Sequence, residues 1–299
     1  MSDTGSNNSK KEIDVLIEMI RANPFPQALE DARAALDSLG TPVSDDIAVK
    51  KIKIGNVACQ MLTPDSADET RLIVYLHGGG YALGSLDSHA GLASEIGKAA
   101  GCCVLQVDYR LAPEHKFPAP VEDACAVYAA LLKQGYASEK IALAGDSAGG
   151  GLVIGTIHTL KEKGLALPGA AICLSPWIDF EFTGESIERC KDIDPMINDQ
   201  SLALMVEAYM AGQDLRNPAA APLYADLTDF PPLLIQVGES EVLFSDAERL
   251  ALNAKAAEVE VVFEKWPEMI HVWQLFYPML SEGRSAIAGI GDFFRENTT

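Results

Sequence analysis

The stretch Ile141-Ala142-Leu143-Ala144-Gly145-Asp146-Ser147-Ala148-Gly149-Gly150-Gly151-Leu152 decides the fold class of this chain. Its first four residues form an apolar run typical of a buried strand, and the residues from Ala148 onward predict a helix. Gly145 and Gly149 stand two positions before and two positions after Ser147. A turn this tight holds its central residue in a strained backbone conformation, and bulkier residues on either side would clash. The stretch therefore predicts a strand, a sharp turn and a helix, with the Ser147 hydroxyl above the carboxyl edge of a sheet.

Ser147 has the sequence surroundings of a nucleophilic serine. A G-x-S-x-G segment between a buried strand and a helix is the turn from which serine hydrolases present their nucleophile. The start of the following helix offers free N–H groups and the positive end of the helix dipole, which favour developing negative charge. A glycine-rich turn with an incidental serine would share the pattern. The choice between the two depends on the rest of the chain.

Strand-like and helical stretches alternate from residue 72 to the C-terminus. Apolar runs predict strands at residues 72–76, 103–107, 141–144, 171–174, 233–237 and 259–263. Helices are predicted at about 89–100, 121–134, 148–163, 246–257 and 283–296. Alternation at this spacing requires crossover connections, so we expect a mostly parallel central sheet flanked by helices, the α/β class.

The N-terminal part of the chain has a different texture. Residues 1–10 are polar and predict a flexible tail. Residues 12–39 carry apolar positions at helical spacing, broken by two prolines, and predict two helices with a kinked link. Gly55-Asn56 between two strand-like runs, 48–54 and 57–62, predicts an antiparallel hairpin.

A long polar interval between Trp177 and Leu233 interrupts the alternation, with one clear helical stretch at about residues 200–211. Long insertions in compact domains are usually lids or binding elements. We expect residues 1–45 and about 180–215 to form a small helical cap over a catalytic domain of residues 46–299. Surface decoration without a role is the alternative.

A second glycine-rich loop follows the first predicted parallel strand, at His77-Gly78-Gly79-Gly80-Tyr81. Acyl transfer builds negative charge on the carbonyl oxygen, and convergent backbone N–H groups stabilise that charge. Glycines let such a loop approach a substrate closely, and an HGGG segment accompanies the serine turn in esterases and lipases. We expect the N–H groups of Gly78, Gly79 and Ala148 to form the oxyanion hole.

Together these motifs resemble the hormone-sensitive-lipase-like family of α/β-hydrolase carboxylesterases, in its bacterial form. The resemblance rests on the HGGG segment at 77–80, on Asp108-Tyr109-Arg110-Leu111-Ala112-Pro113-Glu114 and on Gly145–Gly149, and extends from about residue 72 to the C-terminus. It implies an α/β-hydrolase fold with a cap built from the N-terminal helices. It also implies a carboxylesterase that acts on short-chain acyl esters without a cofactor.

His271 is the predicted general base. In α/β-hydrolases the acid and then the histidine follow the serine along the chain, and His271 is the only histidine after His158. Serine needs an imidazole to accept its proton. His158 lies about three turns along the helix after Ser147, too far to reach, and His77 is expected to brace the oxyanion loop. The resembling family has His-Gly-Phe where this chain has His271-Val272-Trp273.

Three carboxylates compete for the role of the acid that orients His271: Glu239, Glu241 and Asp246. Glu241 matches the acid position of the resembling family, although Asp is commoner there. A carboxylate of either length can hold the imidazole tautomer and stabilise imidazolium. Asp246 is interpreted as a residue of the first helical turn, favoured by the helix dipole. We therefore assign Glu241, with Asp246 as the open alternative.

Other residues of the motifs are interpreted mainly as structural. Asp146 is expected to order neighbouring loops through hydrogen bonds, and Arg110, Glu114 and Asp123 to form buried bridges beneath the oxyanion strand. Tyr81, Trp177 and Met196 are candidate walls of the substrate pocket, although aromatic and Met side chains more often pack in a core.

Composition limits the partners. The net charge of −20 repels nucleic acid and anionic membranes. No apolar run reaches the length of a membrane span, and the six cysteines have neither metal-site nor disulfide spacing. Residues 1–12 are polar, so we expect no secretory signal. We expect a cytoplasmic protein that binds a small-molecule ester and no metal or cofactor, and that forms a homodimer through the edge strand at 259–263.

The predicted reaction is hydrolysis of short- to medium-chain acyl esters, with a preference near C2–C8, by two-step acyl transfer through an acyl-enzyme on Ser147, with His271 and Glu241 as base and orienting acid. A lactone or amide hydrolase would share every one of these residues. A non-catalytic small-molecule receptor on the same fold is a further alternative, but such receptors typically lack the base, which is present here as His271.

Overall fold

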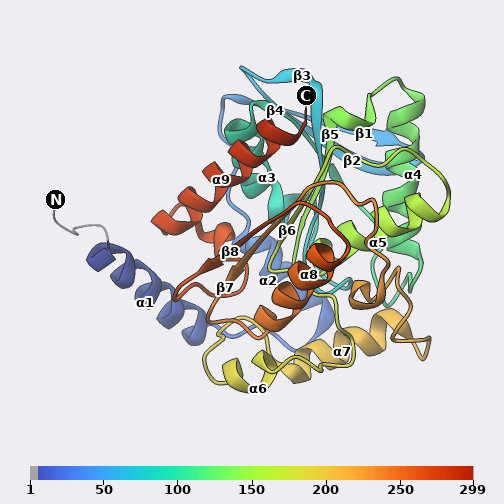
Figure 1. Cartoon of the computed structure of the whole chain (residues 1–299). Helices are drawn as coiled ribbons and strands as arrows, with labels where there is room; N and C mark the ends of the chain where they lie inside the picture. Colours follow the sequence, from blue (N-terminus) through green and yellow to red (C-terminus); the bar gives the residue numbers. More distant parts are fainter. Residues whose placement is uncertain (1–5, 299) are drawn as a thin grey trace.

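The computed structural model describes residues 6–298, and in this part of the chain the centre is an eight-stranded sheet (Figure 1). The strands are β1 (Ile47–Ile54), β2 (Val57–Pro64), β3 (Asp68–Leu76), β4 (Cys102–Val107), β5 (Ile141–Asp146), β6 (Ala170–Leu174), β7 (Leu233–Gly238) and β8 (Val261–Trp266). Their order is β1-β2-β4-β3-β5-β6-β7-β8. Strand β2 is antiparallel to both its neighbours, β1 and β4, whereas strands β3 to β8 all run parallel to one another. The predicted α/β-hydrolase architecture is confirmed.

Helices cover both faces of this sheet. Helices α3 (Leu86–Ala100) and α9 (Ser281–Asn297) pack against each other on one face. Helices α4 (Ala119–Lys133), α5 (Ala148–Glu162) and α8 (Phe244–Ala256) lie on the other (Figure 1). Strands β4 to β7 are buried along their whole length because both faces are covered.

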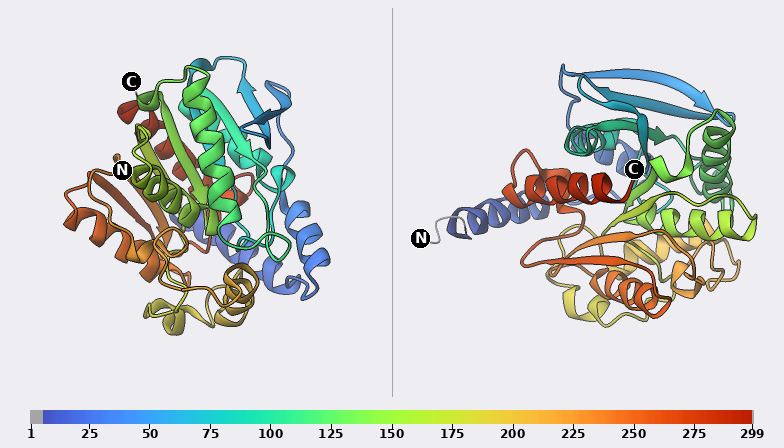
Figure 2. Two further views of the ribbon diagram at one scale, coloured as in Figure 1. Left: turned by 90° about the vertical axis from the view of Figure 1, so that its right-hand side faces the viewer. Right: turned by 45° about the horizontal axis from the view of Figure 1, so that its top comes forward.

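The remaining helices lie around the carboxyl edge of the parallel strands. Helix α1 (Ser6–Ala22) extends outward past α9, and α2 (Leu29–Leu39) follows it (Figure 2). The insertion after β6 contains α6 (Ser186–Cys190) and α7 (Asp199–Met210). Short 3-10 turns complete the chain at Ser138–Lys140, Pro222–Tyr224 and Trp273–Phe276.

Each predicted helix and strand corresponds to an observed one, although bounds other than the start of α1 differ by up to four residues, as at β3, which begins at Asp68 rather than 72. Three further differences have an identifiable cause or consequence. Residues 1–5 of the expected tail lie outside the described residues, but residues 6–10 belong to α1, so the tail prediction is wrong there. The last strand begins at Val261 rather than 259, because the Val259 N–H closes the end of α8 on the carbonyl of Ala254. Helix α6 was not predicted, since five residues are too few to show a helical period.

The six cysteines are free and buried, in agreement with the sequence analysis. Within residues 6–298, no helix combines the length and apolar character needed to cross a membrane.

Close approach of backbone at the turn after β5 generates a stability prediction. A Cβ added at Gly149 would overlap the carbonyl oxygens of Leu76 and His77, which cannot move without displacing β3. Gly149→Ala is therefore expected to lower the free energy of unfolding by about 3 kcal/mol, in the range of overpacked cores. Gly289→Ala on α9 is the matched control, because the nearest atom would lie at 3.7 Å. That variant is expected to be more stable by roughly 0.5 kcal/mol, because alanine is the better helix former. Urea denaturation of both variants checks the pair, and equal effects would contradict the close-approach argument.

Candidate active site

Ser147 stands at the junction of β5 and α5 in a strained conformation, with φ 53° and ψ −121°. Its N–H donates to the Leu174 carbonyl at 2.8 Å, and its own carbonyl accepts from Trp177 N–H at 3.0 Å. The turn can pass this closely only because Gly145 and Gly149 have no Cβ; one at either position would meet backbone atoms. The backbone thus holds the serine at the carboxyl edge of the sheet, 9% exposed, as the sequence predicts.

His271 lies within hydrogen-bond distance of this serine. Its Nε2 is 2.9 Å from Ser147 Oγ, and its Nδ1 is 2.7 Å from Glu241 Oε2. The imidazole follows β8 across a short loop, and the next residue, Val272, is anchored by an N–H bond to Ser175 Oγ at 3.2 Å. The structure therefore joins a serine, an imidazole and a carboxylate from three loops in one hydrogen-bonded row.

Glu241 is fully buried and has both carboxylate oxygens engaged. Oε1 accepts the Gly238 N–H at 2.9 Å, while Oε2 faces His271. A carboxylate held by a backbone donor on one oxygen has little freedom to turn away from the imidazole. Glu239, one of the two competing acids, is exposed.

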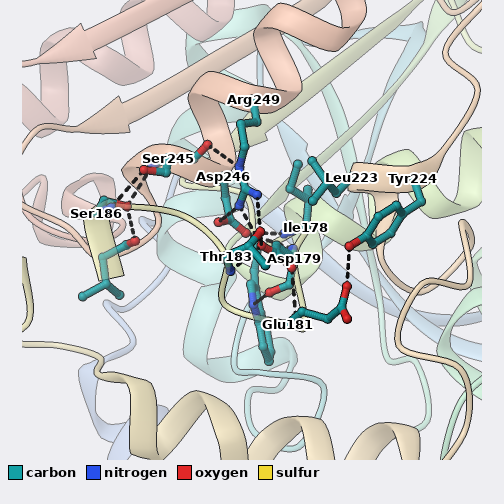
Figure 3. A network of polar contacts seen from close by, with 12 residues as sticks. Ile178, Asp179, Glu181, Thr183, Ser186, Leu223, Tyr224, Ser245, Asp246 and Arg249 are labelled. Carbon is teal, nitrogen blue, oxygen red and sulfur yellow. Dashed lines mark hydrogen bonds and ion pairs between the residues drawn. The ribbon is translucent and has the colours of Figure 1, made fainter. Parts of the chain in front are cut away.

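Asp246, the other competing acid, has different partners, shown in Figure 3. Its Oδ2 accepts the N–H groups of Ile178 and Asp179 at 2.9 and 3.0 Å, and its Oδ1 contacts Arg249 at 3.0 Å. Burial raises the pKa of Asp246 to about 7, against the lowering effect of these bonds. It therefore fastens the loop after β6 to α8, a more specific role than the expected favourable contact with the helix dipole.

The pKa of His271 is raised above its ordinary value. Burial by itself lowers it, but the Glu241 hydrogen bond and the charges of Glu241, Asp194 and Asp146 outweigh that effect. An imidazole in this setting is a stronger base toward Ser147, and its protonated form is stabilised.

The oxyanion loop requires one correction to the predicted donors. The Gly78 N–H donates to Asp146 Oδ1 at 3.0 Å and is not available to an oxyanion. Among the described residues, the N–H groups of Gly79, Gly80 and Ala148 have no hydrogen-bond acceptor. Gly79 and Gly80 adopt φ values of 110° and 62°, a region open to glycine at low cost. Of the three predicted oxyanion-hole donors, Gly79 and Ala148 therefore remain candidates, and Gly80 is a further candidate in place of Gly78.

Asp146 explains this arrangement and fulfils the bracing role predicted for it. Besides Gly78, its carboxylate accepts from Tyr75 Oη at 2.7 Å and lies 3.2 Å from His89 Nε2. Burial alone would raise the pKa of Asp146, but His89 and the Tyr75 hydrogen bond hold it below the ordinary value. His77 stacks on Tyr109 at 4.3 Å and also serves the loop's structure.

The three predicted pocket residues fall in two places. Tyr81 and Trp177 are each 1% exposed and pack in an aromatic cluster with Phe180 and Tyr209, so they are core residues. Met196 instead lines a cavity of about 180 Å³ with residues of the two N-terminal helices and of the link between them, namely Met19, Ile20, Asn23, Phe25 and Leu39.

The predicted bridges are only partly buried. Arg110 binds the buried Asp123 with two nitrogens at 2.8 to 3.0 Å, as expected. Glu114 is exposed and pairs with Arg33 of α2 at 2.8 Å, so it connects the N-terminal helices to this loop.

Sequence reasoning missed Gly80, Ser175 and Asp194. Gly80 has no signal beyond being the third glycine of its run. Ser175 and Asp194 stand in loops where polar residues are common, and only the fold brings them to His271 and the Glu241 loop. No group of three or more potential metal-binding side chains occurs among residues 6–298.

The comparisons with known proteins agree with this architecture. Residues 73–275 match the family described as alpha/beta hydrolase fold. An acetyl-hydrolase from Streptomyces hygroscopicus is 43% identical over 96% of this chain and 97% of its own. An esterase from Acinetobacter venetianus is 32% identical over 91% and 89%. A crystal structure of an esterase from the bacterial hormone-sensitive lipase family superposes with a TM-score of 0.94 and 44% identity over the whole of both chains. The resemblance drawn from the motifs is confirmed, and the chain belongs to the α/β-hydrolase fold family, among its bacterial hormone-sensitive-lipase-like esterases.

Proposed function

We propose that this carboxylic ester hydrolase cleaves short-chain acyl esters through an acyl-enzyme on Ser147. The observation that carries the proposal is the row of two contacts, 2.9 Å from Ser147 Oγ to His271 Nε2 and 2.7 Å from His271 Nδ1 to Glu241 Oε2. A nucleophile bonded to a base, and the base to an orienting acid, is the arrangement that acyl transfer requires.

The reaction proceeds in two steps of the same form. His271 Nε2 takes the Ser147 proton as Oγ attacks the ester carbonyl, and the free N–H groups of Gly79, Gly80 and Ala148 stabilise the oxyanion. The imidazolium, held by Glu241, returns the proton to the leaving alcohol. Water then gives a proton to His271, attacks the acyl-enzyme and releases the acid, and Ser147 Oγ regains its proton.

Short acyl chains are supported by two observations. A relative with 43% identity is named an acetyl-hydrolase. The cavity bounded by Met196 has a volume of about 180 Å³, and a cavity of roughly 150 Å³ accommodates a benzene-sized molecule. We propose that this cavity receives the acyl chain and that residues 1–45 and about 180–215 form the cap around it.

The cap proposal is supported by contacts between its two parts. Arg21 of α1 donates to the carbonyls of Asp192 and Ile193 at 3.1 and 3.2 Å, and both parts line the cavity.

We also propose a homodimer through β8, which is one of the two edge strands of the sheet and is half-exposed. The free buried thiols support a reducing, cytoplasmic setting.

The nucleophile assignment predicts the outcome of one substitution. Ser147→Ala removes the attacking oxygen, so turnover of p-nitrophenyl acetate is expected to fall by at least about 10⁴-fold. Labelling by a fluorophosphonate is expected to disappear with it, while the circular dichroism spectrum stays unchanged. Ser285→Ala, at an exposed position on α9, is the matched control and is expected to keep full activity. Retained turnover in Ser147→Ala would overturn the proposed mechanism.

The acid assignment predicts opposite effects for two isosteric variants. Glu241→Gln loses the charge that faces His271, and kcat is expected to fall by roughly 10³- to 10⁴-fold, as when an orienting carboxylate is neutralised. Asp246→Asn disturbs the contacts with Arg249 and the loop after β6, so its main effect is expected on thermal stability, with kcat within about tenfold of the parent. Steady-state kinetics and melting curves separate the two, and a larger rate loss from Asp246→Asn would reverse the assignment.

The cavity predicts a chain-length preference. On p-nitrophenyl esters from C2 to C12, kcat/KM is expected to be highest between C2 and C6 and to fall for longer chains. Met196→Ala enlarges the cavity and is expected to move the optimum to longer chains, whereas Met279→Ala at an exposed position leaves it in place. Including a lactone and an anilide in the series tests the alternative substrate classes; faster turnover of either would contradict the ester proposal.

A further inference from the structure

Asp194 is a buried carboxylate close to the proposed catalytic row and outside it. The residue is 9% exposed and follows α6 in the insertion. Its Oδ1 accepts the Met196 N–H at 2.8 Å and the Ile197 N–H at 3.3 Å, while its Oδ2 accepts the Val242 N–H at 3.0 Å. One side chain thus bridges the insertion and the loop that carries Glu241.

Asp194 is hydrogen-bonded to Val242, the residue directly after Glu241. Val242 gives its N–H to Asp194, and its carbonyl accepts from Ser186 Oγ. A second pair of bonds, between Ser186 and Ser245 at 2.9 and 3.0 Å, fixes the start of α8 to the same segment. The backbone around the acid is therefore held by polar groups of the insertion rather than by the sheet alone.

On its other side, the Asp194 segment touches the proposed cap. Arg21 of α1 donates to the carbonyls of the two residues that precede Asp194. Asp194 itself accepts the N–H of Met196, and the Met196 side chain lines the cavity. Met196 in the cavity wall is therefore connected through Asp194 to Val242, so a displacement of Met196 can be transmitted to the loop that carries Glu241.

Asp194 also contributes to the charge around the base. Against the lowering effect of burial, the carboxylates of Glu241, Asp194 and Asp146 raise the pKa of His271. Asp194 in turn interacts with His271 and Glu241, and Cys190 lies near both carboxylates with a thiol whose pKa is raised by burial. Burial raises the pKa of Asp194 to about 6, against the lowering effect of His271 and the backbone donors, so the group is mainly ionised at neutral pH.

We propose that Asp194 is a positioning residue for ester hydrolysis, which holds the Glu241 loop to the cap segment and places a further buried negative charge near His271, beside those of Glu241 and Asp146. The proposal rests on the proposed roles of Ser147, His271 and Glu241. Its chemical consequence is a more stable imidazolium during each proton transfer, with Glu241 kept in line with Nδ1.

Asp194→Asn removes the charge at nearly constant size and keeps an acceptor for the Val242 N–H, but its NH2 then faces the N–H groups of Met196 and Ile197, so the charge effect is read from the acid limb and the bonding effect from kcat. Loss of a negative charge near His271 lowers the pKa of its imidazolium, so the base stays unprotonated to lower pH. The acid limb of kcat/KM is expected to move about 0.5 to 1 pH unit to lower pH. The value of kcat at the plateau is expected to fall roughly three- to thirtyfold with KM nearly unchanged. Asp192→Asn, an exposed carboxylate of the same segment, is the matched control and is expected to leave both values in place.

A second substitution at Asp194 distinguishes the effect of its charge from that of its position. Asp194→Glu keeps the charge but alters the reach, and is expected to restore the acid limb toward that of the parent while kcat stays reduced. It also carries the test if Asp194→Asn does not fold, as judged by circular dichroism. An acid limb unmoved in Asp194→Asn, or moved equally in Asp194→Glu, overturns the role of Asp194 while an inactive Ser147→Ala leaves the proposed function standing. Retained turnover in Ser147→Ala overturns both.

Discussion

The rest of the site depends on the close approach of three backbone segments at the turn after β5. Ser147 is held at φ 53° because the chain passes from strand to helix against the carbonyl of Leu76, with no room for a Cβ at Gly145 or Gly149. Strained backbone persists only where the surroundings over-determine it. Here β3, β5 and β6 do so: the same packing that strains the serine also brings the oxyanion loop and the loop after β6 to it.

Buried carboxylates then organise the loops around this turn. Asp146 fixes Gly78, Glu241 faces His271, Asp246 holds the loop after β6, and Asp194 holds the loop of the acid. Each accepts at least one backbone N–H, so each buried charge is compensated by donors in a loop or, for Glu241, at the end of β7. The loops at the carboxyl edge therefore have defined positions even though they lack the regular hydrogen bonding of the sheet.

Much of this was predictable from the sequence, and the failures have physical causes. Ser147, His271 and Glu241 lie together as expected because the carboxyl ends of parallel strands meet at one edge, so strand order and chain order suffice to bring them close. The role of Gly78 was predicted wrongly because a pattern of glycines does not reveal where the neighbouring Asp146 side chain points. Tyr81 and Trp177 lie in the core for a similar reason: periodicity does not tell which loop aromatics turn inward. Asp194 had no sequence signal, since its partner Val242 is far along the chain.

The bonds from Ser186 and Asp194 to Val242 have a consequence for how such an enzyme can diversify. The insertion after β6 looks like an appended module that could be exchanged for another to obtain a new substrate range. Its first half, however, is bonded to the backbone beside the acid, and the turn after α7 is tied as well, because Gln213 Nε2 donates to the Phe117 carbonyl at 2.8 Å. At Gly212 a side chain would meet no other atom within 4 Å, but the φ of 83° there favours glycine. Replacement of the whole insertion is therefore constrained at both ends, and new specificity is more easily acquired by changing single side chains within it than by exchanging the segment.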